Sequence, residues 1–424
     1  MPESVVPATL SSHSQSPASS PLPRAAAAAH SPQPRRQRVL FFVEGFTDIR
    51  FVEGLSRICD LTMLVPERHY VSSGLRDRIG DLLLPLRVRQ ISGRRLAFQL
   101  CSLAALWRCA GGFDVILAQE ALRGALNANL VGRLKRIPVV TYVGISPLEY
   151  FRCRRERGQL GRLSSAFGEA VIHGLLWING RMAARCLAMG PYLREVTARY
   201  CPRTETGLYY GVDTRLFRPA AAAERAALRR LLGLPRDKFL VLLSSRISHE
   251  KDPETVLRAV SIARDQGLNA VLLNLGGGWN EFLTVARGLG LQEPDCWVMA
   301  RPAANPMTEV FDYFRAADAV AMASLAEGAA YSTLEALACG VPVVATAVGG
   351  MAVQLRGYAR LVARRDSAAM ARELLWVAAN PASARAQALE GRDYVVREWD
   401  SRRAFAELER TLAQVAAPPA RDFP

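Results

Sequence analysis

Short runs of consecutive apolar residues alternate along the chain with segments of helical periodicity. The first run, Arg38–Val43, ends shortly before Gly45, and a helical pattern follows through Ile58. Continuous apolar runs of this length are typical of strands that are buried on both faces of a parallel sheet. Further strands are expected at 61–65, 114–118 and 138–143. Strands that alternate with helices in this way predict an α/β fold.

The same alternation begins again in the second half of the chain. Strands are expected there at 239–243, 270–275, 296–300, 319–323 and 341–345, and the 424 residues suffice for two domains. We therefore predict two doubly wound, Rossmann-like parallel-sheet domains that face each other across a cleft. The expected parts are a disordered tail at 1–36, a domain at 37–213, a linker at 214–222, a domain at 223–390, and a helix at 391–415 that returns to the first domain.

Charge is distributed unevenly between the two halves. Residues 1–219 contain 30 Lys and Arg against 16 Asp and Glu, a balance of +14, whereas residues 220–424 contain 24 against 23, a balance of +1. A basic half is expected to be attracted to acidic lipids, a lipid pyrophosphate or nucleic acid. No nucleic-acid-binding motif accompanies the charge, so nucleic acid is not an expected partner.

Cysteine usage and hydropathy bear on the compartment. The eight cysteines include no Cys-x-x-Cys pair, which favours free thiols in a reducing, cytoplasmic environment. No apolar stretch approaches the roughly 20 residues that a membrane-spanning helix needs. A stripe formed by Leu96, Leu100, Leu103 and Trp107 is expected to pack on the sheet.

Candidate chemistry concentrates between Ser324 and Gly350. A strand is expected to end near Ser324 and a helix to begin near Ser332, so the intervening loop lies where open α/β sheets bind ligands. Backbone N–H groups at a helix N-terminus can hold a phosphate. The candidate contacts in this segment are Glu327, Gly328, Ala329, Ala330, Tyr331, Ser332 and Glu335.

Each further candidate has a competing interpretation. Glu335 is either a ligand contact or the last residue of a capping box, Ser332-Thr-Leu-Glu335. Arg246 and Lys251 follow an expected strand and are interpreted as ligand-binding cations instead of solvated charges. Gly45 follows the first strand, where a ligand could approach its backbone. No His, Cys and carboxylate cluster has metal-ligand spacing, so no metal site is expected.

Several motifs together resemble family 4 glycosyltransferases of the GT-B fold. Glu327 and Glu335, followed by Ala-Leu-Ala-Cys-Gly-Val-Pro-Val-Val-Ala-Thr and a Gly-Gly pair, are similar to the Glu-x7-Glu signature of that family. The segment Arg246–Lys251 is similar to its Arg-x4-Lys phosphate-binding segment. Tyr210-Gly-Val-Asp213 is similar to the stretch that leads into its interdomain linker.

The resemblance implies a retaining transferase that moves a sugar from a UDP- or GDP-linked donor and needs no obligatory metal. It implies that Arg246 and Lys251 bind the donor pyrophosphate, that Glu335 binds ribose, and that Glu327 binds the transferred sugar. Backbone groups from Ala329 to Ser332 would contact sugar and phosphate. The implied acceptor is a glycan or a lipid-linked precursor in cell-surface or exopolysaccharide synthesis.

One departure concerns the acceptor side. Thr141-Tyr-Val-Gly144 stands where the family often has Thr-x-His-Gly, so Val143 replaces the histidine. Tyr142, Ser146 or Glu149 are the expected substitutes, and a non-catalytic GT-B partner protein is the alternative function. The basic run Arg152–Arg157 follows this acceptor-side segment, and Arg133, Lys135 and Arg136 precede its strand. We expect the basic first half, through these residues, to attach the protein peripherally to the anionic inner membrane face.

Overall fold

The computed structural model describes residues 36–91, 96–119, 121–156, 162–291, 297–302 and 304–417. The predicted disordered tail falls almost entirely on residues 1–35, outside these ranges. Arg36, which that prediction includes, donates a hydrogen bond to the carbonyl oxygen of Ser56 at 3.0 Å.

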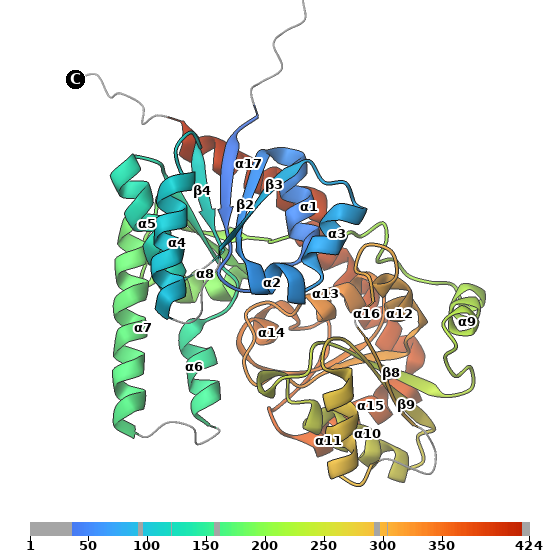
Figure 1. The fold of residues 1–424 in the computed structure, drawn as a ribbon. Coiled ribbons are helices and arrows are strands. Elements are labelled where there is room, and N and C mark those ends of the chain that lie inside the picture. The colour runs from blue at the N-terminus through green and yellow to red at the C-terminus, as the bar shows by residue number, and fades with distance from the viewer. Residues whose placement is uncertain are drawn as a thin grey trace, which may run out of the picture. The chain divides into compact units, whose positions relative to one another are not determined.

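The first lobe is built on a sheet of seven parallel strands in the order β3-β2-β1-β4-β5-β6-β7 (Figure 1). Its strands are β1 (Arg38–Phe42), β2 (Asp60–Pro66), β3 (Leu86–Ile91), β4 (Val115–Ala118), β5 (Val139–Val143), β6 (Arg185–Met189) and β7 (Thr204–Gly207). Its helices are α1 (Ile49–Ile58), α2 (Glu67–Ser72), α3 (Leu75–Asp81), α4 (Leu96–Cys109), α5 (Arg123–Lys135), α6 (Pro147–Arg155), α7 (Arg162–Met182) and α8 (Gly190–Ala198).

Side chains of β1 alternate between the two faces of this sheet. Leu40 and Phe42 belong to one apolar cluster with Phe98 of α4. Phe41 points to the other face, where its ring centroid lies 5.5 Å from that of Phe51 in α1. Because both faces are covered by helices, every residue from Val39 to Val43 is buried, which explains the uninterrupted apolar run in the sequence.

The second lobe is built on six parallel strands in the order β10-β9-β8-β11-β12-β13. Its strands are β8 (Phe239–Ser244), β9 (Ala270–Leu275), β10 (Val298–Arg301), β11 (Ala319–Met322), β12 (Val343–Thr346) and β13 (Arg360–Val362). Its helices are α9 (Ala222–Leu231), the 3₁₀ turn η1 (His249–Lys251), α10 (Pro253–Asp265), α11 (Trp279–Gly288), α12 (Val310–Ala316), α13 (Tyr331–Ala338), α14 (Gly349–Gln354) and α15 (Ser367–Ala379). Two separate parallel sheets confirm the predicted fold class.

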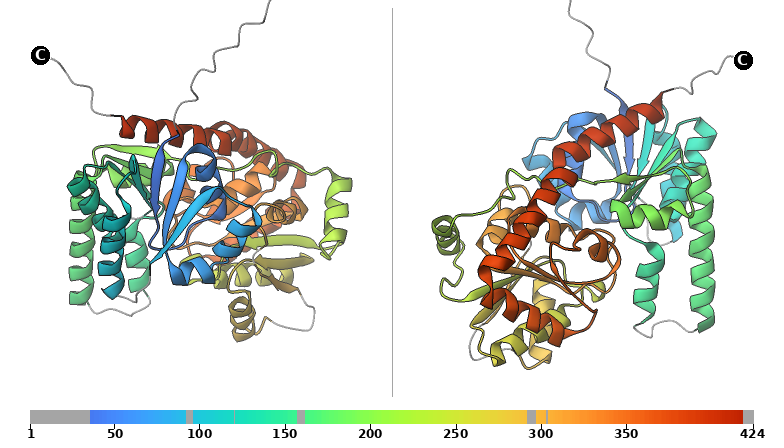
Figure 2. Two further views of the ribbon diagram at one scale, coloured as in Figure 1. Left: turned by 45° about the horizontal axis from the view of Figure 1, so that its top comes forward. Right: turned by 180° about the vertical axis from the view of Figure 1, so that it is seen from behind.

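Two final helices lead from the second lobe back to the first. They are α16 (Pro381–Glu398) and α17 (Ser401–Ala416), and α17 packs on α1, β4 and β7 (Figure 2). The sequence pattern predicted one helix over 391–415, but the helix breaks at Trp399 and Asp400. There the chain forms an isolated parallel bridge with Val212 of the segment between the two sheets.

Candidate functional site

The strand order reverses once in each sheet, and this places the candidate residues. The reversal lies between β1 and β4 in the first sheet and between β8 and β11 in the second. Loops that follow such neighbouring strands diverge and leave a crevice at their carboxyl ends. Arg246 follows β8 and Glu327 follows β11, whereas Gly45 and Gln119 follow β1 and β4. Gly45 lies in the bend after β1 and is partly buried.

Lys251 and Glu327 form an ion pair between the loops after β8 and β11. The hydroxyl of Ser324 donates to the same Glu327 oxygen at 3.2 Å, and the two charged side chains are only 18% and 12% exposed. The backbone N–H of Leu325 donates to the carbonyl of Glu250 at 2.7 Å, which ties the Glu327 loop to η1. The structure thus brings two of the predicted catalytic residues into direct contact.

Arg246 lies in the same loop but reaches toward solvent. Its side chain is 62% exposed and pairs with Glu250. Burial acts to raise the pKa of Glu250, but hydrogen bonds from its own backbone and from Ser248, together with the charges of Arg246 and Lys251, lower it overall. Glu250 is therefore ionised and holds a cation at the edge of the crevice, where an anionic group could displace it.

The loop after Glu327 packs against backbone on two sides. A Cβ atom added at Gly328 would lie 2.6 Å from the carbonyl oxygen of Gly144, in the loop after β5 of the first lobe. One added at Gly350 would lie 1.8 Å from the carbonyl oxygen of Gly328. Gly350 donates its N–H to the carbonyl of Glu327 at 2.9 Å, and Ala329 is buried. Only glycine fits at this contact between the lobes.

The start of α13 excludes the capping-box interpretation. The helix begins at Tyr331, and the residue at its N-cap is Ala330, which makes no side-chain cap hydrogen bond. Ser332 is already inside the helix, so it is not the N-cap residue, and the capping box that would have engaged the Glu335 carboxylate does not form. The Tyr331 hydroxyl donates to the carbonyl of Leu208 in the first lobe. The Tyr331 side chain therefore bridges the two lobes, and only the backbone of Tyr331 could contact a ligand bound at the loop.

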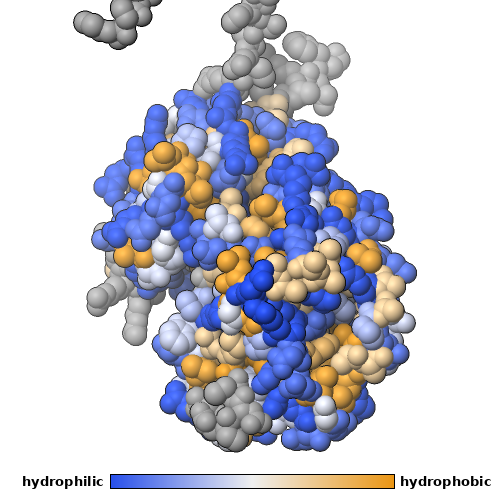
Figure 3. Space-filling view, turned by 90° about the vertical axis from the view of Figure 1, so that its right-hand side faces the viewer, coloured by the Kyte–Doolittle hydropathy of each residue, from blue (hydrophilic) through white to orange (hydrophobic). Residues whose placement is uncertain are grey.

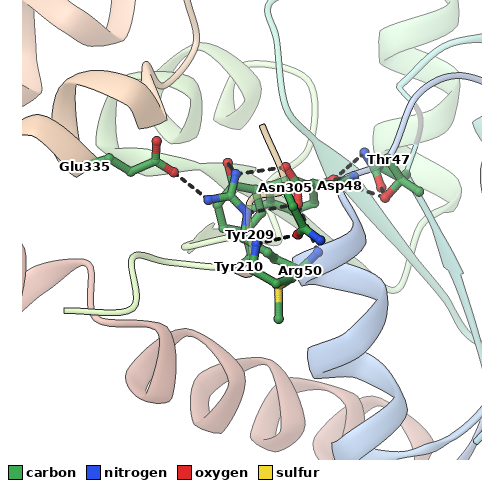
Figure 4. Close-up of polar contacts among 9 residues, drawn as sticks. Thr47, Asp48, Arg50, Tyr209, Tyr210, Asn305 and Glu335 are labelled. Atoms are coloured by element: carbon green, nitrogen blue, oxygen red, sulfur yellow. Dashed lines mark hydrogen bonds and ion pairs between the residues drawn. The ribbon is translucent and has the colours of Figure 1, made fainter. Parts of the chain in front are cut away.

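Glu335 is buried and pairs with an arginine of the first lobe (Figure 4). Its Oε1 lies 2.6 Å from Nη1 of Arg50, which belongs to the first turn of α1. Burial is the largest influence and raises the pKa of Glu335, while the charge of Arg50 opposes it. The two lobes therefore meet at a carboxylate that the family resemblance assigns to ribose.

Arg50 is held in place by contacts with two further residues, Asp48 and Tyr210. Its Nε lies 3.0 Å and its Nη2 2.9 Å from the two carboxylate oxygens of Asp48, the N-cap residue of α1. The Arg50 Nη2 also donates to the Tyr210 hydroxyl at 2.9 Å, and the guanidinium carbon lies 4.1 Å from the centroid of that ring. Because these partners fix the planar group, Arg50 presents its remaining N–H groups to Glu335 in a defined direction.

The Tyr209 hydroxyl joins the loops after β1 and β4. It accepts hydrogen bonds from the Gln119 side chain at 3.0 Å and from the backbone N–H of Asp48 at 3.1 Å, and it lies 3.1 Å from the Thr47 hydroxyl. Thr47 in turn donates to Gln119 at 2.7 Å. Burial is the main cause that raises the pKa of Tyr209 to about 12. This network rigidly positions Asp48 and hence Arg50.

A pocket of about 590 Å³ lies on the linker side of Arg50. Arg50, Tyr210, Phe217, Met307 and Phe405 are among the residues that line it, whereas Arg246, Lys251 and Glu327 are not. The pocket therefore extends from the Arg50–Glu335 contact toward the segment between the sheets and away from the predicted pyrophosphate-binding cations.

The acceptor-side candidates have different surroundings. The Tyr142 hydroxyl accepts the backbone N–H of Tyr209 inside the core, which is inconsistent with a role for Tyr142 in acceptor contact. Ser146 caps α6 by accepting the N–H of Glu149 at 3.4 Å. Glu149 accepts a hydrogen bond from Tyr192, whose ring lies 3.3 Å from a Cβ added at Gly349. Burial raises the pKa of Glu149. Through Tyr192, Glu149 is thus linked to Gly349, at the start of α14.

Sequence reasoning did not identify Asp48, Arg50, Gln119 or Tyr209. An N-cap signal was present, because Asp48 precedes a helical pattern, but it gives no indication that the next turn carries a contact to residue 335. Within the described ranges, no group of three or more His, Cys, Asp and Glu side chains could hold a metal ion.

Residues 224–393 match the family model described as glycosyl transferases group 1. This region is a group 1 glycosyltransferase domain. It contains Arg246, Lys251, Glu327 and Glu335, all of which lie at the carboxyl side of the second sheet.

The chain is 30% identical over 270 residues to D-inositol 3-phosphate glycosyltransferase 1 of Catenulispora acidiphila, a match that covers 60% of each chain. It is 39% identical over 149 residues to D-inositol 3-phosphate glycosyltransferase of Mycobacterium tuberculosis, covering 34% of this chain and 30% of that one. The matches thus span less than two thirds of these relatives.

Solved structures extend the likeness of the group 1 domain to both lobes. Anabaena HepE in complex with UDP and glucose matches with a TM-score of 0.70 at 16% identity, over 89% of this chain and all of HepE. Sucrose-phosphate synthase from Thermosynechococcus elongatus matches with a TM-score of 0.70 at 17% identity, over 89% of this chain and 99% of that one. The chain has the GT-B fold, which confirms the resemblance inferred from the Glu-x7-Glu and Arg-x4-Lys segments.

Proposed function

We propose that the chain is a retaining hexosyltransferase that uses a UDP- or GDP-linked sugar donor. The observation that carries the proposal is the contact between Lys251 and Glu327 at the carboxyl ends of β8 and β11, within the group 1 domain. The UDP-bound structural relatives are consistent with such a donor.

Cations would supply the electrostatic part of the reaction. Negative charge grows on the nucleotide diphosphate as the bond to the sugar breaks, and fixed positive groups stabilise it. Arg246 is largely exposed and Lys251 is mostly buried. The Arg246 side chain can therefore move with the ligand, while Lys251 stays in place. Both are now neutralised by Glu250 and Glu327, and a bound pyrophosphate would take over those contacts.

Two carboxylates would orient the donor. Glu335 would accept hydrogen bonds from the ribose hydroxyls, and Glu327 from the hydroxyls of the transferred sugar. Because Arg50 already contacts Glu335 at 2.6 Å, the ribose would share this carboxylate with the first lobe. Gly328 to Ser332 would contribute backbone contacts, and the bend at Gly45 would leave room for the sugar.

The acceptor we propose is a glycan or lipid-linked precursor used in surface or exopolysaccharide synthesis at the cytoplasmic membrane face. The relatives named for D-inositol 3-phosphate suggest a second candidate, a phosphorylated polyol. A non-catalytic partner protein that binds the donor without turnover is the alternative to both.

A donor screen tests the proposal. Thermal unfolding should shift upward with UDP- or GDP-sugars, because a ligand that binds only the folded state stabilises it. Slow hydrolysis of the same donor should follow, and NMR of the released sugar should show the anomeric configuration of the donor. Binding without hydrolysis or transfer would favour the non-catalytic alternative, and no shift with any nucleotide sugar would reject the proposed function.

A further inference from the structure

Helix α4 is apolar on its outer face as well as on the face that packs against the sheet. Leu106 is buried, but Leu100 is 72% and Trp107 47% exposed. The prediction that Leu100 and Trp107 pack on the sheet was therefore wrong: Leu103 joins the apolar cluster beneath the helix, whereas these two point outward. A helix that is hydrophobic all round is normally covered on every side.

The neighbouring helices continue this surface. α5 packs against both α4 and α7, and the three stand side by side on one side of the first sheet (Figures 1 and 2). Exposed large hydrophobic side chains on them are Leu100, Trp107, Leu130, Leu134, Phe167, Val171, Trp177 and Ile178. We call the outer faces of α4, α5 and α7 the helical face. For comparison, Figure 3 shows the right-hand side of the view in Figure 1, and there hydrophilic residues lie between groups of hydrophobic ones.

Among the described residues of the helical face, the one acidic side chain is paired and the remaining charges are positive. α4 and α5 contain no acidic residue, and the one in α7, Glu169, pairs with Arg152 and Arg155. The basic residues of the three helices include Arg108, Arg123, Arg133, Lys135 and Arg181. The Lys135 ammonium lies 4.6 Å from the ring centroid of Trp107, and the Arg181 guanidinium carbon lies 5.3 Å from that of Trp177.

These tryptophans lie toward the same end of the surface. α4, α5 and α7 each lead into a strand of one parallel sheet, so the three helices run in the same direction and end at the same edge. Trp107, Lys135 and Trp177 all belong to the last turns. Tryptophan paired with a long basic side chain is typical of protein surfaces at the boundary between lipid and water.

The basic run that the sequence analysis expected to contact a membrane has other partners. Arg152 and Arg155 pair with Glu169, and Glu156 pairs with Arg364 and Arg365 of the second lobe. Cys153 packs against Leu325 and Ala326 beside the Glu327 loop. Within the described part of this run, Arg152 and Arg155 are therefore paired inside the first lobe, and Cys153 and Glu156 contact the second lobe.

We propose that the helical face docks the protein onto an anionic lipid surface. The proposal rests on the membrane partner proposed above and assigns it to α4, α5 and α7. Apolar side chains would enter the interface while arginine and lysine meet lipid phosphates. A second copy of the chain fits less well, because two such faces would bring positive charges together. None of the helices in the described ranges could cross a bilayer, so the contact would be interfacial.

Cosedimentation with vesicles tests the docking surface. The full chain should bind vesicles that contain phosphatidylglycerol, bind weakly to pure phosphatidylcholine, and dissociate as salt is raised. The combined variant Leu100→Glu, Leu134→Glu and Phe167→Glu should lower partitioning about tenfold or more. These three side chains are 72%, 70% and 73% exposed, so the fold should tolerate the changes.

Leu231→Glu is the control, because Leu231 is 77% exposed and lies on α9 of the second lobe, away from the helical face. This variant should cosediment with vesicles to the same extent as the unmodified chain. Thermal shifts with nucleotide sugars, measured without vesicles, keep the donor site as a separate readout. Equal binding to both lipids, or equal loss in the Leu231→Glu control, would overturn the proposal. So would a dimer that only the combined variant dissociates, since a second copy would then cover the face. Vesicle binding without any donor binding would leave the docking surface standing and reject the transferase function.

Discussion

The guanidinium of Arg50 and the carboxylate of Glu335 lie 2.6 Å apart, although they belong to different lobes and are separated by 285 residues. Glu335 is held in the second turn of α13, and Arg50 is oriented by Asp48 and Tyr210. The contact joins α1, the helix after the first strand of the first lobe, to Glu335 in α13 of the second lobe, which is the proposed ribose-binding carboxylate. If Glu335 binds ribose as proposed, this ion pair couples the approach of the two lobes to the occupancy of the proposed donor site.

Replacing Arg50 by methionine should destabilise the folded chain. Removal of one member of a buried ion pair leaves the other charge unpaired and typically costs about 3–5 kcal/mol. Urea unfolding should show this loss, and the double variant Arg50→Met and Glu335→Gln should recover much of it. Arg57→Met is the control, because Arg57 lies on the same helix but its side chain is 72% exposed. Additive losses in the double variant would show that the pair is not coupled.

Glu335→Gln alone should weaken donor binding more than it weakens folding. An amide keeps the shape of the side chain but replaces one acceptor oxygen by a donor group, so the paired contacts with Arg50 and with ribose hydroxyls are lost in part. Isothermal titration with the nucleotide sugar, run beside thermal unfolding, separates the two effects. Normal affinity together with weaker folding would assign Glu335 a purely structural role.

Arg246→Ala and Lys251→Ala should each lower turnover by about 10²–10³-fold, the usual loss when one donor to a developing negative charge is removed. Lys238→Ala is a suitable control, because Lys238 precedes β8 whereas Arg246 and Lys251 follow it at the carboxyl end. Single-turnover kinetics at saturating donor would show the loss in the chemical step. Either variant that retains full turnover removes that residue from the proposed reaction.

Gly328→Ala should force the lobes apart at the loop after Glu327. The added Cβ would lie 2.6 Å from the Gly144 carbonyl oxygen and 2.6 Å from Cδ1 of Leu193, and overpacking of this kind costs about 1–3 kcal/mol. Donor hydrolysis should fall. Gly288→Ala, at a helical position where nothing lies within 4 Å of the added atom, should leave hydrolysis unchanged. A full rate in Gly328→Ala would mean that this close approach is unnecessary.

Asp400 should make the junction before α17 sensitive to acid. It caps α17, and its carboxylate accepts the Thr214 hydroxyl at 2.5 Å and Arg402 Nε at 2.9 Å. Burial opposes ionisation, but the hydrogen bonds from Arg402 and Thr214 outweigh it and lower the pKa below 3.8. A lowered pKa stabilises the fold at pH values above 3.8, and this contribution is lost as the pH falls through the pKa of the folded state.

The variant Asp400→Asn should keep most of the cap and lose this pH dependence, whereas Asp400→Ala should also lose about 1 kcal/mol at neutral pH. Urea unfolding between pH 3 and 6 measures both. An unchanged slope of stability against pH in Asp400→Asn would contradict the assignment.

Strands buried on both faces could be predicted from the sequence, because their apolar runs are continuous. β3 was missed because it is an edge strand whose exposed Arg87 and Arg89 interrupt the apolar pattern. β6 was missed for a different reason: it follows α7, whose outward residues Phe167, Val171 and Ile178 are apolar and blur the boundary between helix and strand. β7 follows α8 and was missed because its sequence, Thr-Glu-Thr-Gly, contains no apolar run.

The sequence motifs likewise predicted only some of the residues that the structure places at the candidate site. Lys251 and Glu327 could be named because each lies in a loop directly after a strand. Their mutual contact follows from β8 and β11 being neighbours, which is a property of strand order. Arg50 could not be predicted as a site residue, because its contact with Glu335 forms only when the two lobes come together. Motif spacing within one lobe carries no information about contacts between lobes.

The chain passes between the lobes twice, and the two crossings are bonded to each other. The Val212 N–H donates to the carbonyl of Trp399 at 2.7 Å, and the Ser401 N–H donates to the carbonyl of Val212 at 3.0 Å. A single flexible crossing would let the lobes twist and slide, but two bonded crossings act as one short ribbon. Such a ribbon bends readily about one axis and resists torsion. We therefore expect the lobes to swing in a way that changes the width of the crevice and keeps Arg50 facing Glu335.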